Sequence, residues 1–275
     1  AEIGQAYPAF VKYATSSYQE VMTELGIPKK AQQMLDAYWC YIGIPSDEFE
    51  FPYFAEMLVT YVEHGAYAPQ KRSHQLTSAL VKSIQEHGGE VWFNAEVEQI
   101  LTKAGRATGV RVGDQEIRAK AVISNALPTT VFGKLLPEAA VPARARQLEN
   151  ARQRGTSGFL VYLGLNKSAE ELGIKDYSVF ISSTGDSRKQ FERQKTIEDN
   201  DFMIMNCLNL AVPNCSPAGT AILYATQLYA DGTWDQVQPG DYQAMKEEIA
   251  RRVINEYEAA TGVTIHDAIE EIEIA

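Results

Sequence analysis

The sequence predicts a mixed α+β protein, in which helices flank two sheets and the larger sheet is mainly antiparallel. Three observations lead to this prediction. Apolar residues recur at helical spacing in the first quarter of the chain, short alternating runs follow near the middle, and longer apolar runs separated by turns fill the second half. Because helices and strands do not alternate regularly, a repeated βαβ series is not expected.

The first quarter is expected to be helical. Apolar spacing indicates helices over residues 5–25 and 29–42, and Ser46 or Asp47 can cap a third helix that runs to about His64. Residues 34–67 hold nine of the 27 aromatic residues in the chain, about twice the share expected from length. This enrichment has two interpretations: an ordinary helical core, or the wall of a cavity for a long apolar ligand.

The middle of the chain is expected to contain one helix and then a meander of strands. The helix begins after Ser73 and ends at the paired glycine Gly88-Gly89. The strand-like runs that follow are EVWF, VEQILT, ATGVRV, EIRA and AVISNA.

The second half is expected to form the larger sheet. A charged helix over residues 141–154 precedes it, and an amphipathic helix from residue 241 to about 260 follows most of it. The polar segment 184–201 is expected to be a solvated loop with some helix. The expected strands are FLVYLGL, YSVFIS, FMIMNCLNL, AILYATQLY and the closing IEEIEIA.

Composition and charge limit the binding partners and the cellular compartment that can be expected. The formal net charge of -11 and the pI near 4.9 argue against a nucleic-acid partner, since phosphate binding needs a basic face. Three cysteines without a CxxC pair are more natural in a reducing cytoplasm than in a secreted scaffold. The longest apolar run is far shorter than the ~20 residues that cross a bilayer. A cytoplasmic protein is expected, with peripheral contact to a membrane left open.

Self-contained catalytic motifs are absent from the sequence. The four histidines are scattered, so no metal site is expected, and no residue is nominated as a general acid or base. No G-x-G-x-x-G fingerprint joins a strand to a helix. Gly88-Gly89 lies after a helix, at the negative end of its dipole, where phosphate would be repelled. It is therefore interpreted as a helix terminator.

Residues 38–128 resemble the middle of the phytoene desaturase-like flavoproteins, a group of carotenoid desaturases, carotene isomerases and retinol saturases. In this group a helix ends at Gly-Gly, and a strand and a V-x-x-I motif follow. Motifs similar to AGRATGVRV and AKAVISNALP of this chain come next. Later segments, such as FLVYLGLN and the closing IEEIEIA, also sit where the group has comparable ones. The resemblance covers nearly the whole chain. The glycine fingerprint of the first βαβ unit and the last segment of the group are missing, so a central fragment of a longer protein is expected.

The resemblance implies a partial FAD/NAD(P)-binding domain and a substrate domain. Residues 1–70 would be the helical part of the substrate domain, 71–135 the partial FAD-binding domain, 136–265 the antiparallel sheet and helices of the substrate domain, and 266–275 the start of the return to the FAD domain.

The resemblance also implies cofactor contacts at single residues. Val97 matches a valine that contacts the adenine end of FAD, and Asn125 and Ala126 match a strand end near the pyrophosphate. The group's PKGGS loop is PQKRS here, Pro69 to Ser73, with two basic residues in place of glycines. Positive φ would be costly at those residues.

The expected function is that of an FAD-dependent oxidoreductase acting on a polyene or isoprenoid lipid by desaturation, saturation or isomerisation. The fragment alone would be inactive, because it lacks most of the cofactor site. Two alternatives stay open. One is a flavin amine oxidase-like enzyme, and the other is a non-catalytic module that binds lipid or protein.

Overall fold

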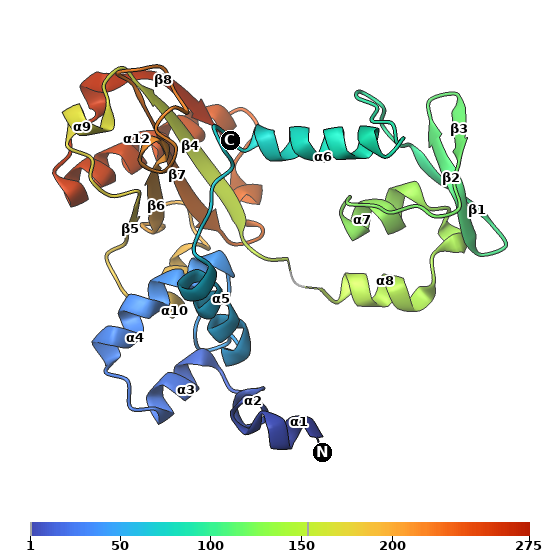
Figure 1. Cartoon of the computed structure of the whole chain (residues 1–275), viewed down its shortest axis with the longest axis horizontal. Helices are drawn as coiled ribbons and strands as arrows, with labels where there is room; N and C mark the ends of the chain where they lie inside the picture. Colours follow the sequence, from blue (N-terminus) through green and yellow to red (C-terminus); the bar gives the residue numbers. More distant parts are fainter. Residues whose placement is uncertain (1, 153) are drawn as a thin grey trace. The chain divides into compact units, whose positions relative to one another are not determined.

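The computed structural model describes residues 2–152 and 154–275 and confirms the expected α+β class (Figure 1). Its contacts divide the chain into two compact units, which are described separately. The first unit comprises Ala1–Leu76 and Gly155–Ala275, and the second comprises Thr77–Arg154. The domain boundaries expected at residues 70, 135 and 265 stay predictions.

The first unit begins with short helices. They are α1 (Glu2–Ala6), α2 (Pro8–Tyr13), α3 (Tyr18–Glu24), α4 (Lys29–Asp36), a 3-10 helix (Ala37–Tyr41) and α5 (Phe51–His64). The single helix expected over residues 5–25 is therefore wrong. Ser17 starts a new helix, because its hydroxyl accepts from the Glu20 N–H at 3.2 Å and its own N–H donates to the Glu20 carboxylate at 2.8 Å.

Five strands of the first unit form one sheet. They are β4 (Ser157–Leu165), β5 (Ser178–Ile181), β6 (Met203–Cys207), β7 (Ala221–Tyr229) and β8 (Ile269–Ile274). Their order is β5-β6-β7-β4-β8, and every neighbouring pair is antiparallel. The expected antiparallel sheet is confirmed, with β5 and β8 at its edges.

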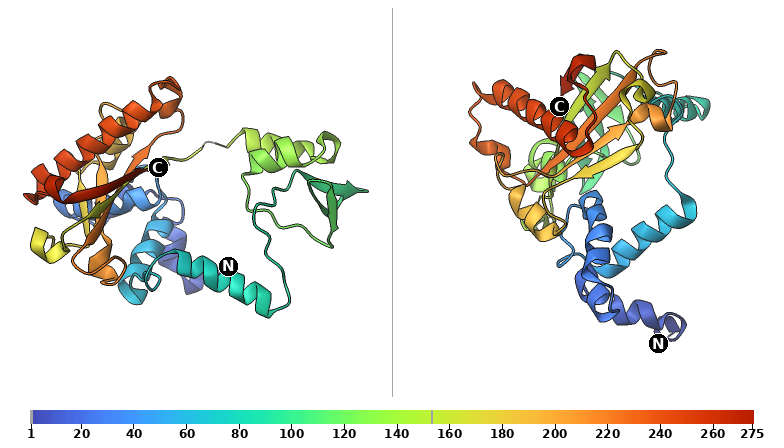
Figure 2. Two further views of the ribbon diagram at one scale, coloured as in Figure 1. Left: turned by 90° about the horizontal axis from the view of Figure 1, so that it is seen from above. Right: turned by 90° about the vertical axis from the view of Figure 1, so that its left-hand side faces the viewer.

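The inner face of this sheet is covered by α12 (Tyr242–Thr261), which lies along it in Figure 2. Ile249, Val253 and Tyr257 recur at helical spacing on α12 and are buried against the alternate strand residues that face it. The remaining helices of the unit are α9 (Ala169–Leu172), α10 (Ser187–Arg193), α11 (Leu208–Ala211) and the 3-10 helices Thr233–Gln236 and His266–Ala268.

Polar groups are also buried beneath α12. The Tyr229 hydroxyl donates to the Gln227 side chain at 3.1 Å, and the Arg252 guanidinium donates to the Ile197 carbonyl at 2.8 Å. Burial raises the pKa of Glu256, and the nearby Arg252 lowers it by a smaller amount. This carboxyl is therefore less stable in its charged form than it would be in water.

The second unit consists of short helices and a three-stranded antiparallel sheet in the order β1-β2-β3. Its elements are α6 (His74–Glu86, which starts in the first unit), β1 (Gln99–Lys103), β2 (Arg106–Val112), β3 (Gln115–Arg118), α7 (Pro128–Thr130), a π-helix (Val131–Leu135), a 3-10 helix (Glu138–Ala140) and α8 (Ala143–Asn150).

The paired glycine is confirmed as the end of α6. The Gly89 N–H donates to the Ile84 carbonyl at 2.9 Å and the Gly88 N–H to the Gln85 carbonyl at 3.0 Å, while Gly88 has a φ of 79°. This is the Schellman arrangement, in which a left-handed residue satisfies the last helical carbonyls.

Two of the expected strands in the second unit are wrong. The runs around Trp92 and Ile123 have no strand assignment. A strand exists only where a neighbour supplies hydrogen bonds, and periodicity alone does not show whether a neighbour is present. Ile123 is 97% exposed and Phe93 is 77% exposed, so apolar side chains of both segments lie open in this chain.

Candidate functional site

Val97, the first of the expected cofactor residues, lies two residues before β1 and is half-buried. The next residue continues the pairing of β1, because the Glu98 N–H donates to the Arg111 carbonyl at 2.9 Å. The hairpin of β1 and β2 therefore fixes the backbone on one side of Val97. Its role toward a cofactor stays a prediction.

Asn125 and Ala126, the other expected residues, are exposed and lie just before α7. The Ala126 N–H donates to the Ser124 hydroxyl at 3.2 Å. Downstream, Lys134 forms an ion pair with Glu96 at 3.3 Å, which links the π-helix after α7 to the residue beside Val97. The role of Asn125 and Ala126 toward a cofactor stays a prediction.

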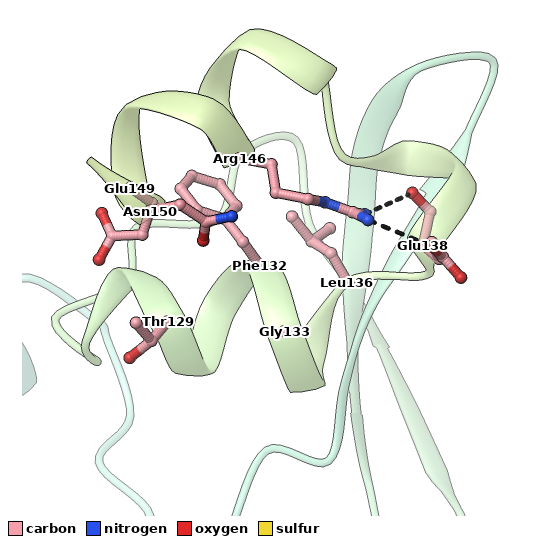
Figure 3. Close-up of a pocket in the computed structure, with 8 residues that line it drawn as sticks. All are labelled: Thr129, Phe132, Gly133, Leu136, Glu138, Arg146, Glu149 and Asn150. Carbon is pink, nitrogen blue, oxygen red and sulfur yellow. Dashed lines mark hydrogen bonds and ion pairs between the residues drawn. The ribbon is translucent and has the colours of Figure 1, made fainter. Parts of the chain in front are cut away.

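A cavity of about 370 Å³ lies in the second unit, between α8 and the helical segment that starts at α7 (Figure 3). Two of its charged side chains are engaged with each other, since the Arg146 guanidinium donates to the Glu138 carboxylate at 3.1 Å. Phe132 and Leu136 form its apolar part. The residues that line it include neither Val97 nor Asn125 and Ala126, so this cavity is not the expected cofactor site.

The PQKRS loop contains one residue with a left-handed backbone. Lys71 has a φ of 69°, in the left-handed region where glycine is favoured. The backbone at this position is therefore the kind that a glycine would adopt, although a lysine occupies it.

The outer face of the five-stranded sheet, opposite α12, carries a line of polar side chains. Ser178 pairs with Asn206, Asn206 with Tyr224, and Tyr224 with Tyr162, so the four residues stand side by side across β5, β6, β7 and β4. Paired residues of neighbouring strands share a face. We call these four residues the polar row. Its line ends at Glu273 on the edge strand β8.

Hydroxyl groups dominate one half of the polar row. The rings of Tyr162 and Tyr224 have centroids 6.1 Å apart, and Tyr162 is 39% exposed. Burial raises the pKa of Tyr224 above its usual value, and the Tyr177 hydroxyl beside it raises the pKa further. Tyr224 therefore keeps its proton at neutral pH and can both donate and accept a hydrogen bond.

The next line of residues on the same face is mostly apolar, and helical residues cover part of it. Phe180 pairs with Ile204. Trp39, from the 3-10 helix, is buried in one cluster with Ile204 and Phe202, and Phe180 packs against this cluster. Helical residues of the first unit therefore cover the apolar part of the outer face, and the polar row lies next to the covered part.

Three tyrosines extend this aromatic surface. The rings of Tyr38, Tyr41 and Tyr61 lie 6.0 to 6.1 Å from one another, and Phe180 lies 5.9 Å from Tyr38 and 6.1 Å from Tyr41. We call Tyr38, Tyr41 and Tyr61 the tyrosine group. Tyr41 and Tyr61 are 48% and 43% exposed. The aromatic segment 34–67 thus divides: some rings form the helical core, and the tyrosine group lines an open surface.

Sequence reasoning did not find the polar row. Alternation predicts which residues of one strand share a face, but the row exists only through the register between four strands. The aromatic enrichment of residues 34–67 does not by itself distinguish the tyrosine group from the rings of the helical core.

Within residues 2–152 and 154–275, no group of three or more His, Cys, Asp or Glu side chains is placed to hold a metal ion. Over the same residues, none of the helices has the length and apolar character needed to cross a bilayer.

The sequence matches a protein family and curated relatives. The family described as flavin containing amine oxidoreductase matches residues 19–273. All-trans-retinol 13,14-reductase from Danio rerio is 28% identical over 239 residues, which cover 84% of this chain and 37% of that protein. A chloroplastic prolycopene isomerase from Arabidopsis thaliana is 26% identical over 184 residues, which cover 66% of this chain and 30% of that protein. The chain spans about a third of the length of these relatives.

A solved structure shows the same fold. An oxidoreductase from Methanosarcina mazei superimposes with a TM-score of 0.65 at 17% identity, over 94% of this chain and 56% of that protein. At this level of identity the likeness concerns the fold alone.

Proposed function

The chain belongs to the family of flavin containing amine oxidoreductases, and from this premise we propose that it is the central part of an FAD-dependent oxidoreductase acting on a polyene or similar isoprenoid lipid. The expected resemblance to the phytoene desaturase-like group is confirmed, since the relatives are named for a retinol reductase and a prolycopene isomerase. The proposal concerns a longer protein, because the chain spans about a third of their length.

The observation that carries the proposal is the aromatic outer face of the five-stranded sheet. Phe180 and the tyrosine group provide ring faces for a long hydrocarbon, and Tyr162 and Tyr224 border them. Apolar and aromatic walls are typical of sites for such ligands. We propose that this surface holds the substrate chain and keeps water from it.

The proposed cofactor contacts lie in the second unit. Val97, Asn125 and Ala126 would hold part of FAD, and the remaining contacts would come from sequence outside this chain. When bound, the flavin supplies the chemistry of hydride transfer, and the protein supplies binding and orientation. The chain by itself is proposed to be inactive for this reason.

The proposed roles of the segments follow the domains expected from the sequence. Residues 1–70 and 136–265 would form the substrate domain, 71–135 the FAD-binding part, and 266–275 the return between them. The reaction would be desaturation, saturation or isomerisation. We place the protein in the cytoplasm, with peripheral contact to the membrane that dissolves such a lipid.

The test uses the full-length protein, purified and assayed with a polyene and with an amine. A bound flavin, seen by its visible absorbance, together with turnover of the polyene supports the proposal. A colourless protein that does not bind FAD would defeat it in favour of a lipid- or protein-binding module. A flavoprotein that turns over only the amine would favour the amine oxidase alternative.

A further inference from the structure

The polar row contains a hydrogen-bonding group that the chain itself leaves unused. The Ser178 hydroxyl is buried and has no hydrogen-bond partner in the part of the chain that the structure describes. Asn206, its direct neighbour across the strands, is only 8% exposed. Buried amides and hydroxyls are normally paired, because an unpaired one costs free energy. Both side chains point to the outer face, away from α12.

Other members of the polar row complete a set of donors and acceptors. Asn206 pairs in register with Tyr224, so its amide stands next to a protonated phenol. An amide offers both a donor and an acceptor, and so does each hydroxyl. The four residues therefore suit an uncharged oxygen, such as that of an alcohol or a carbonyl, and the Glu273 carboxylate at the end of their line would repel an anionic group.

The polar row borders the aromatic surface directly. Phe180 is two residues from Ser178 on β5, so both side chains face the same side of the sheet. Phe180 in turn contacts Tyr38 and Tyr41 of the tyrosine group. A molecule that lies across this border meets hydrogen-bonding groups at one end and rings along the rest.

We propose that the polar row binds the alcohol or carbonyl oxygen at the end of a polyene whose hydrocarbon chain lies against Phe180 and the tyrosine group. This inference rests on the proposed function and deepens it, because it assigns a polar end group to the substrate. Asn206 is the main specificity residue, since it is only 8% exposed and lies between the unpaired Ser178 hydroxyl and Tyr224.

The test compares two polyenes of equal length, one ending in an alcohol and one in a hydrocarbon, with the full-length flavoprotein. The variants are Asn206→Leu and Tyr224→Phe, and the control is Gln243→Leu, an exposed amide on α12. The unaltered protein should prefer the alcohol. Asn206→Leu should lower this preference in kcat/KM by roughly tenfold, mainly by raising KM for the alcohol, because it removes one hydrogen-bonded group. Gln243→Leu should leave the preference unchanged.

The outcomes separate this inference from the proposed function. If both polyenes are turned over and neither row variant changes the preference, the inference is overturned and the proposed function stands. If neither polyene is turned over, the proposed function fails, and equilibrium binding of the two polyenes still decides the inference. Equal affinity for both then overturns it, whereas tighter binding of the alcohol that Asn206→Leu or Tyr224→Phe abolishes supports it. Tyr224→Phe serves if Asn206→Leu does not fold.

Discussion

Replacing Trp39 by phenylalanine should weaken the attachment of the helical residues to the outer face of the sheet. Trp39 is 1% exposed, and its indole N–H donates to the Gln190 side-chain oxygen at 2.6 Å. Gln190 is itself only 5% exposed, and its amide nitrogen is held by the Thr184 carbonyl at 2.6 Å. The oxygen therefore has little freedom to turn toward water once its partner is removed.

Two effects of the substitution can be estimated from these contacts. An unpaired buried carbonyl costs about 1–3 kcal/mol, and the smaller ring leaves space beside Phe191 and Phe202 that costs about 1 kcal/mol more. Trp39 has ring centroids 6.2 Å from each of these phenylalanines. The free energy of unfolding should fall by about 2–4 kcal/mol in total.

Urea unfolding followed by circular dichroism would measure this loss. The matched control is Trp92→Phe at a site that is 51% exposed, where a change within about 0.5 kcal/mol is expected. A double-mutant cycle with Gln190→Leu isolates the hydrogen bond and should give a coupling of about 1 kcal/mol. A coupling near zero, or a loss no larger than that of the control, would refute the reasoning.

Three further predictions concern single positions. Lys71→Gly should raise the free energy of unfolding by about 0.5–1 kcal/mol, because glycine adopts a φ of 69° without strain, and a lower urea midpoint would contradict this. Gly109→Ala should cost roughly 3 kcal/mol or more, since the new Cβ would lie 2.1 Å from the Ile117 carbonyl oxygen; unchanged hydrogen-exchange protection of β2 and β3 would show that the backbone adapts. Burial raises the pKa of Glu256 in the folded state. The stability that the Glu256 carboxyl contributes is therefore present below its unfolded pKa of about 4.5 and is lost as the pH rises through the folded pKa. Glu256→Gln should remove this loss and make the protein more stable at neutral pH relative to the unaltered chain, as unfolding measured at several pH values would show.

Local signals predicted much of the fold. The stripe on α12 and the end of α6 at Gly88-Gly89 follow from interactions within a few residues, and the structure confirms both. The capping box of Ser17 with Glu20 is also a local signal that the sequence carries. Its helix start outweighs the continuous apolar spacing around it.

Features that depend on distant partners were harder to predict. The runs at Trp92 and Ile123 have the composition of strands, but composition does not supply a neighbour to pair with. The polar row could not be predicted from any single strand, because Asn206 and Tyr224 look ordinary within their own strands. Only the pairing of segments far apart in the sequence brings them together. Val97, Asn125 and Ala126 came from a family resemblance, and their contact with a cofactor stays a prediction.

The edge strand β8 has a consequence for how the protein behaves in concentrated solution. An edge strand presents unpaired backbone groups that can join the sheet of another molecule. Glu270, Glu271 and Glu273 place three carboxylates along this short edge. Two molecules approaching edge to edge would bring these charges together, so repulsion opposes fibrous aggregation near neutral pH.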